Sequence, residues 1–280
     1  MEEAGEQALF RSVRFLQSIG VPHFALLPYR YLLVVLTRVF AHHPDPDPAN
    51  LRLLGRWFWR AAVLGPEIFK GSATGAMRML CTRVRPGDLT GSIGDLLSAL
   101  DNHHVKVPDL RRFRTNEAAA KITLCSWWDL GPRSPDTADC FEQSQLAGAL
   151  IDRPTAADVV PSFFARQTVP EPYRLWAASR VLLPELKEPL SAVAGVFAQR
   201  PITMDEELWA RVLHSHSISS ESENLLSSGE VVGFLETRQA DLQRVLESFL
   251  RRKCECGISR LFAVLSRLLS VRTWRRVWGW

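Results

Sequence analysis

A long helical pattern near the carboxyl-terminal end constrains the fold more than any other feature of this sequence. Between Glu230 and Lys253, hydrophobic residues recur every three or four positions, which is the spacing of one face of an α-helix. The positions in this stripe are Val231, Phe234, Leu235, Arg238, Leu242, Val245, Leu246, Phe249 and Leu250. Because the pattern persists for about six turns, the sequence predicts one long helix here.

Shorter stretches with the same period occupy most of the remaining chain. The helices predicted from them cover residues 5–20, 28–42, 51–64, 74–84, 93–100, 116–130, 140–151, 190–199, 204–214 and 219–226. No stretch alternates apolar and polar residues around hairpin turns, which a sheet would require. Residues 155–166 contain Pro161 and are interpreted as a loop or strand remnant. We therefore expect an all-α fold, an irregular multi-helix bundle with a long carboxyl-terminal helix and a basic amphipathic tail.

A polar, basic stretch at residues 101–114 indicates a boundary within the chain. It predicts an amino-terminal helical subdomain at residues 1–110, a carboxyl-terminal helical subdomain at residues 111–256, and a tail at residues 257–280. The tail carries arginine and tryptophan and has no acidic residue. Such a composition is typical of a helix that lies on an anionic membrane or binds a partner, although the tail could also fold back on the body. The residues expected to make such contacts are Arg267, Arg272, Trp274, Arg275, Arg276 and Trp278.

Residues 51–78 combine bulky aromatic groups with regularly spaced arginines. On a helix, Trp57 and Phe58 belong to the apolar stripe, and we predict that they pack in the core. Arg52, Arg56 and Arg60 follow each other every fourth residue beside that stripe. Two interpretations stay open: the arginines cover the aromatic groups of a buried helix, or they recognise phosphate or another protein.

The overall charge restricts the class of partner only weakly. The chain has 34 basic and 30 acidic residues, a formal net charge of +4 and an isoelectric point near 8.9. These values permit contact with nucleic acid or anionic lipid but do not require it. The amino terminus is acidic and lacks the apolar core of a signal peptide, and the cysteine count of five is odd. The natural interpretation is a cytoplasmic protein in a reducing compartment.

The sequence contains no recognisable catalytic or metal-binding motif. A phosphate-binding glycine loop, a nucleophile elbow and a zinc-binding HExxH pattern are all missing. The pairs His42–His43 and His103–His104 point in different directions on any regular element, and Cys254 and Cys256 are too close in sequence to be a usual zinc pair. We therefore expect neither a cofactor nor a metal, and we do not expect an enzyme.

Three stretches follow one another in an order that resembles a known family. They are LPYRYLLVVLTRVFAHHP at residues 27–44, RWFWRAAVLG at 56–65 with GSATGAMR at 71–78, and the closing stretch at 212–250 that begins VLHSHSISSESEN. In this order they resemble the helical region downstream of the ParB-like domain in the GmrSD-type restriction family, which is modification-dependent. The resemblance spans almost all of residues 21–253.

The resemblance also implies a degenerate nuclease region. Members of the family carry an amino-terminal ParB-like domain, then helices, then an HNH-type ββα-metal nuclease module. The histidine segment of that module matches residues 157–161, and the later asparagine-arginine segment matches Ser179 and Arg180. Ala157 and Asp158 stand in place of the histidines, and Ser179 in place of the asparagine. Since alanine and serine supply neither a general base nor a metal ligand, the resemblance implies no catalytic residue.

The ParB-like domain is not part of this sequence, so we expect a carboxyl-terminal fragment or a remnant that acts with a separate ParB-like partner. The resemblance implies a non-catalytic module of a restriction or phage-defence protein that binds DNA or docks on that partner. The residues expected to make these contacts are Arg52, Arg56, Arg60, Arg78, Arg111, Arg112 and Arg114. The alternative is a stand-alone interaction or membrane-peripheral protein that acts through its tail.

Overall fold

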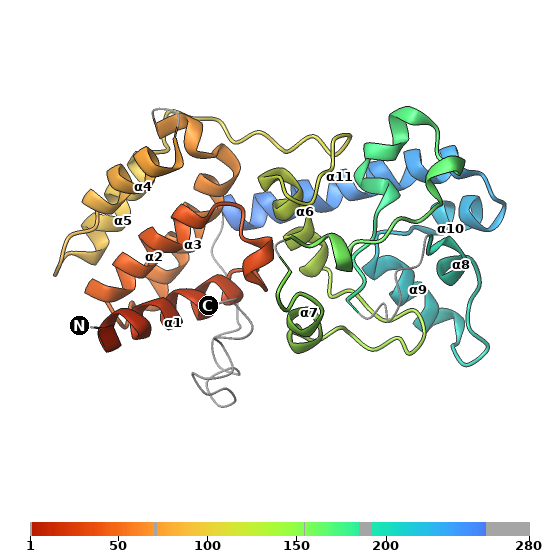
Figure 1. The fold of residues 1–280 in the computed structure, drawn as a ribbon, viewed down its shortest axis with the longest axis horizontal. Coiled ribbons are helices and arrows are strands. Elements are labelled where there is room, and N and C mark those ends of the chain that lie inside the picture. Colours follow the sequence, from red (N-terminus) through yellow and green to blue (C-terminus); the bar gives the residue numbers. More distant parts are fainter. Residues whose placement is uncertain (1, 70–71, 154, 185–191, 256–280) are drawn as a thin grey trace. The chain divides into compact units, whose positions relative to one another are not determined.

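A computed structural model of the chain describes residues 2–69, 72–153, 155–184 and 192–255. Within these ranges the chain forms eleven α-helices and six short 3-10 helices (Figure 1). β-type pairing in the described residues is limited to isolated bridges, and none of these residues forms a strand of a sheet. The predicted all-α fold is confirmed.

The chain divides into two compact units, and each unit is made of segments that are not continuous in sequence. The first unit contains residues 2–21, 27–107 and 249–255, and the second contains residues 22–26 and 108–248. The last helix, α11 (Val231–Glu255), belongs to both, because its residues up to Ser248 are part of the second unit and the rest part of the first. The domain ranges 1–110 and 111–256 stay a prediction, and the tail at 257–280 lies outside the described residues.

The first unit is built from helices α1 to α5. Their bounds are α1 (Glu2–Ser18), α2 (Arg30–His42), α3 (Pro48–Leu64), α4 (Ala73–Thr82) and α5 (Leu89–Ser98), with the 3-10 helix η2 (Pro66–Phe69) after α3. Helices α1 and α2 pack along each other, where the rings of Phe15 and Phe40 lie 5.6 Å apart. Trp57 and Phe58 are fully buried, which confirms the predicted core positions.

Helix α3 begins three residues earlier than the apolar pattern predicts. Asp47 caps it: one carboxylate oxygen accepts hydrogen bonds from the backbone N–H groups of Ala49 and Asn50, at 2.8 and 3.0 Å. Pro48 then occupies the first turn, where its missing N–H is not needed. The helix ends at Gly65, whose φ of 74° suits a residue without a β-carbon.

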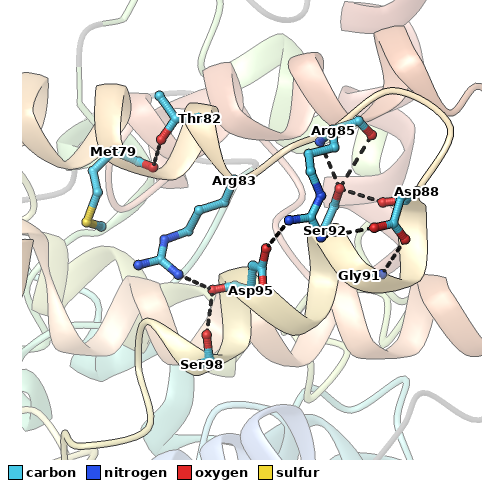
Figure 2. Close-up of polar contacts among 9 residues, drawn as sticks. All are labelled: Met79, Thr82, Arg83, Arg85, Asp88, Gly91, Ser92, Asp95 and Ser98. Atoms are coloured by element: carbon cyan, nitrogen blue, oxygen red, sulfur yellow. Dashed lines mark hydrogen bonds and ion pairs between the residues drawn. The ribbon is translucent and has the colours of Figure 1, made fainter.

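Helix α5 also begins earlier than predicted, at Leu89 rather than residue 93, because Asp88 caps it through the N–H of Gly91 at 2.9 Å. Figure 2 shows the polar network that fixes this connection after α4. The guanidinium of Arg85 bridges the carboxylates of Asp88 and Asp95, at 2.9 and 2.8 Å. Arg83 donates to the backbone oxygen of Asp95 at 2.8 Å (Figure 2). Arg83 and Arg85 are therefore engaged in holding the turn.

The second unit contains shorter helices joined by irregular chain. Its α-helices, in addition to its part of α11, are α6 (Ala118–Trp128), α7 (Gln143–Ala149), α8 (Ala194–Ala198), α9 (Glu206–Ser215) and α10 (Ser220–Ser227). Its 3-10 helices are η1 (Phe24–Leu26), η3 (Ala157–Val159), η4 (Arg166–Thr168), η5 (Glu171–Leu175) and η6 (Ala177–Ser179). The helices predicted at 140–151 and 190–199 are shorter than expected, since α7 has seven residues and α8 five. Of the second prediction, residues 190 and 191 lie outside the described ranges.

Candidate functional site

Two segments that are distant in sequence run antiparallel inside the second unit. Backbone hydrogen bonds join Phe163 N to Ser179 O at 2.9 Å, Val181 N to Pro161 O at 3.2 Å, and Leu183 N to Val159 O at 2.9 Å. Residues 159–163 therefore pair with residues 179–183. These segments include most of the positions that the resemblance matches to the nuclease module, and we call them the paired segments.

The side chains at the matched positions make ordinary structural contacts. Asp158 is exposed, and its carboxylate lies 3.4 Å from Nε of Arg153. The buried hydroxyl of Ser179 donates to the backbone oxygen of Trp176 at 2.8 Å. Across the part of the chain that the structure describes, no three His, Cys, Asp or Glu side chains are close enough to hold a metal ion. The expectation of a non-catalytic region stays a prediction.

A buried arginine from α11 anchors the paired segments. Arg238 is only 1% exposed, and one of its terminal nitrogens, Nη1, donates to the backbone oxygens of Ala178 and Arg180, both at 2.8 Å. Its Nε and Nη2 atoms donate to the backbone oxygen of His216 at 3.2 and 3.0 Å. The guanidinium also lies over the ring of Phe163, 4.6 Å from its centroid.

Burial lowers the pKa of Arg238 to about 9, and the charge of Asp241 partly opposes that effect. The guanidinium therefore stays charged at neutral pH and satisfies three backbone carbonyl groups at once. Removing a donor of this kind leaves buried acceptors without hydrogen bonds, which is costly. Arg238 is thus a structural anchor, since its donors are used inside the protein.

His216 completes this anchor on the side of α9. Its Nε2 atom lies 2.7 Å from the backbone oxygen of Arg133, so the neutral ring donates its proton there. Burial lowers the pKa of His216 to about 4, and the nearby positive charge of Arg238 acts in the same direction. The imidazole is therefore neutral at pH 7. Together, Arg238 and His216 join α9, α11 and the paired segments.

The predicted contact residues of α3 differ in exposure and in the contacts that their guanidinium groups make. Arg52 is exposed and makes no ion pair with any described residue. Arg56 is half-buried, and its Nε atom is buried without a partner among the described residues. Arg60 is only 15% exposed; it lies 3.5 Å from the carboxylate of Asp101 and donates to the backbone oxygen of Leu100 at 3.4 Å. Arg60 therefore serves mainly to hold its own unit together.

The remaining predicted arginines lie on two different units. Arg78 is exposed on α4 in the first unit. In the second unit, Arg112 is exposed and makes no ion pair with a described residue, Arg111 lies over the ring of Trp176 at 5.6 Å, and Arg114 is 3.8 Å from the carboxylate of Glu117. Whether these residues form one continuous basic face with those of α3 stays a prediction.

The predicted contact residues of the tail lie outside the described residues. These residues are Arg267, Arg272, Trp274, Arg275, Arg276 and Trp278.

Sequence reasoning missed the role of Arg238 and of His216. A usable signal was present for the arginine, because a charged residue stood in the apolar stripe of the long helix. A charge at such a position is expected only where other groups satisfy it. His216 follows the last residue of α9 and caps that helix, and its backbone N–H donates to the backbone oxygens of His214 and Leu213.

Comparisons with protein families, with characterised proteins and with solved structures found no match to this chain. None of the described helices is both long enough and apolar enough to cross a membrane. The case for a function therefore depends on the residues themselves.

Proposed function

We propose that this chain is a non-catalytic helical module of the GmrSD-like restriction type, which acts in the cytoplasm and binds DNA. One observation carries the proposal: the two segments matched to the family's nuclease region pair with each other inside the second unit. The proposal interprets these segments as the pair of extended strands of a ββα-metal module, in which Ala157 and Ser179 would stand where catalytic groups are needed.

Binding of DNA is supported by arginines that have no acidic partner among the described residues. Arg52, Arg78 and Arg112 are exposed, and each makes no ion pair with a described residue. Such guanidinium groups suit phosphate oxygens, which they bind through paired N–H donors. Phosphate contacts position a protein on DNA without reading its sequence. We therefore expect binding that depends strongly on salt and only weakly on base sequence.

The test is fluorescence anisotropy of a labelled DNA duplex titrated with the full chain over a series of salt concentrations. Replacing Arg52, Arg78 and Arg112 together with alanine should weaken binding and reduce the salt slope by about 0.9 for each phosphate that is no longer neutralised. Arg211 is a matched control, because it is exposed on α9 and also makes no ion pair with a described residue. Binding that is undetectable at low salt, or an equal loss of affinity in the control variant, would refute the proposal.

Docking on a separate ParB-like protein is a further part of the proposal. A ParB-like domain would be expected to co-purify with the full chain when both are produced together. The arginine variant used in the DNA experiment separates DNA binding from docking. If docking uses other residues, this variant should still co-purify with the ParB-like domain although its binding to DNA is weakened.

The alternative function, a protein that acts at a membrane surface through its tail, rests on the sequence of residues 258–280. Their combination of arginine and tryptophan with no acidic residue favours anionic lipid. Vesicles containing phosphatidylserine should then bind the full chain and should not bind a variant that lacks residues 258–280. Unchanged binding of the shortened chain would exclude this function.

A further inference from the structure

Two short segments of the second unit lie side by side and bring an arginine against a tryptophan. Two backbone hydrogen bonds, at 2.7 and 2.8 Å, join residues 110–113 to residues 175–177. Between these bonds the guanidinium of Arg111 lies over the ring of Trp176, 5.6 Å from its centroid. The main chain therefore positions this pair of side chains.

Buried neighbours anchor the segment that carries the arginine. Leu110 is 2% exposed and Phe113 is 7% exposed. The ring of Phe113 stacks on that of Trp127, with centroids 5.3 Å apart and planes 10° apart. A carboxylate oxygen of Asp109 accepts a hydrogen bond from the backbone N–H of Arg111 at 2.9 Å. A ligand would thus meet a surface that is already ordered, which lowers the entropic cost of binding.

The side chains around this pair reach the surface. Leu175 is 47% exposed, which is unusual for a large apolar side chain in this protein. The ring of Tyr173 lies beside that of Trp176, with centroids 4.6 Å apart, and both residues are part-exposed. Arg111 and Arg112 are exposed. We call Arg111, Arg112, Tyr173, Leu175 and Trp176 the aromatic patch.

The two arginines of the aromatic patch have charges that no acidic side chain neutralises. Neither Arg111 nor Arg112 forms an ion pair with a described residue. Two acidic residues from neighbouring positions are engaged elsewhere. Glu236 accepts a hydrogen bond from the tyrosine hydroxyl of the patch at 2.6 Å, and Glu171 forms an ion pair with Arg174. Both guanidinium groups are therefore available to an anion.

We propose that the aromatic patch binds single-stranded nucleic acid. An unpaired base packs against the pair of Arg111 and Trp176 and against the exposed Leu175, and Arg112 binds the adjacent phosphate. Every base has a flat face that stacks on aromatic rings and on guanidinium planes, and phosphate oxygens match the paired donors of arginine. An acidic peptide would use only the charges and would leave the rings without a stacking partner.

This inference goes beyond the proposed function, because a duplex hides the faces of its bases and offers the patch only phosphate. The two ideas can therefore fail separately. Loss of duplex binding alone would refute the function proposed above and leave this inference standing, since single strands would still bind.

The experiment is fluorescence anisotropy of the full chain with labelled strands of about 20 nucleotides. The probes are oligodeoxythymidine, oligouridine and an abasic deoxyribose-phosphate strand of the same length. The strands with bases should bind at least about fivefold more tightly than the abasic strand, because stacking adds to the phosphate contacts. Tighter binding of one of the two base-bearing strands would identify DNA or RNA as the ligand.

Substitutions within the aromatic patch test whether it forms the site. Trp176→Leu should remove the preference for strands with bases, whereas Trp176→Phe keeps an aromatic face and should retain most of it. Leu175→Glu adds a negative charge at an exposed position, and should weaken binding at least about tenfold while leaving the urea midpoint unchanged. The matched controls are Trp128→Leu, at a part-exposed tryptophan of α6, and Ile151→Glu, at a position that is 43% exposed. Both controls should bind as the original chain does.

Several results would overturn the proposal. Equal affinity for the abasic strand and the strands with bases would show that only phosphate is bound. A preference for bases that survives in folded Trp176→Leu, or a loss in Leu175→Glu no larger than in Ile151→Glu, would place the binding elsewhere. Binding of poly-glutamate but of no oligonucleotide would show that the patch fits an acidic protein instead.

Discussion

Lowering the pH from 7 to 5 should reduce the free energy of unfolding of this protein, and replacing His216 with glutamine should make that reduction smaller by about 2 kcal/mol. The pKa of His216 is lowered from 6.5 to about 4 in the folded protein. As the pH falls, the unfolded chain therefore takes up a proton first, and the folded state loses stability from about pH 6.5 down to about pH 4. Protonation in the folded state would place a second positive charge beside Arg238.

The magnitude follows from the two pKa values. Between pH 7 and pH 5 an unfolded histidine becomes almost fully protonated, whereas His216 in the folded chain stays mostly neutral. The difference corresponds to about 1.4 pKa units, and each unit is worth about 1.36 kcal/mol, which gives about 2 kcal/mol. Glutamine does not titrate, and its amide N–H can still donate to the backbone oxygen of Arg133.

The assay is urea unfolding, followed by far-ultraviolet circular dichroism at pH 7 and pH 5. The original chain, His216→Gln and His103→Gln are compared, because His103 is exposed and serves as the matched control. The original chain and the control should lose about 2 kcal/mol more than His216→Gln over this range. Equal losses in all three proteins would show that a buried, neutral His216 is not the cause.

Two further substitutions test the packing of each unit. Arg238→Met leaves the backbone oxygens of Ala178, Arg180 and His216 without their donor, and should lower the free energy of unfolding by at least about 2 kcal/mol; an unchanged urea midpoint would contradict the anchoring role. Trp59→Phe removes the hydrogen bond from the indole N–H to the backbone oxygen of Ile19 at 3.0 Å, whereas the indole N–H of Trp57 has no partner among the described residues. Both substitutions remove a similar volume, so thermal unfolding should show that Trp59→Phe lowers the free energy of unfolding by about 1 kcal/mol more than Trp57→Phe does. Equal losses in the two variants would argue against a stabilising role of this hydrogen bond.

The all-α fold could be predicted because an amphipathic helix is marked by an apolar period within a short stretch of sequence. The apolar period of α11 predicted its position almost to the residue, from 230–253 to Val231–Glu255. The starts of α3 and α5 were predicted too late, because the capping aspartates, Asp47 and Asp88, decide these boundaries and the apolar period does not. A helix can begin with a full turn of residues that never reach the core, and only its cap marks that start.

The anchor formed by Arg238 could not be predicted in the same way. Its acceptors are backbone oxygens of residues 22 to 60 positions away, at His216, Ala178 and Arg180. Backbone oxygens have the same chemistry at every residue, so no side-chain pattern reveals which ones an arginine will meet.

The division of the chain between its two units has a consequence for the order of folding during synthesis. The ring of Phe249 packs against Trp59 at a centroid distance of 4.8 Å, inside the first unit. Domains usually fold in the order in which they leave the ribosome. Here the unit that contains the earliest residues cannot complete its core until residues 249–255 have been made, after the whole second unit. The surface of Trp59 that the ring of Phe249 covers therefore stays open until the second unit has been synthesised.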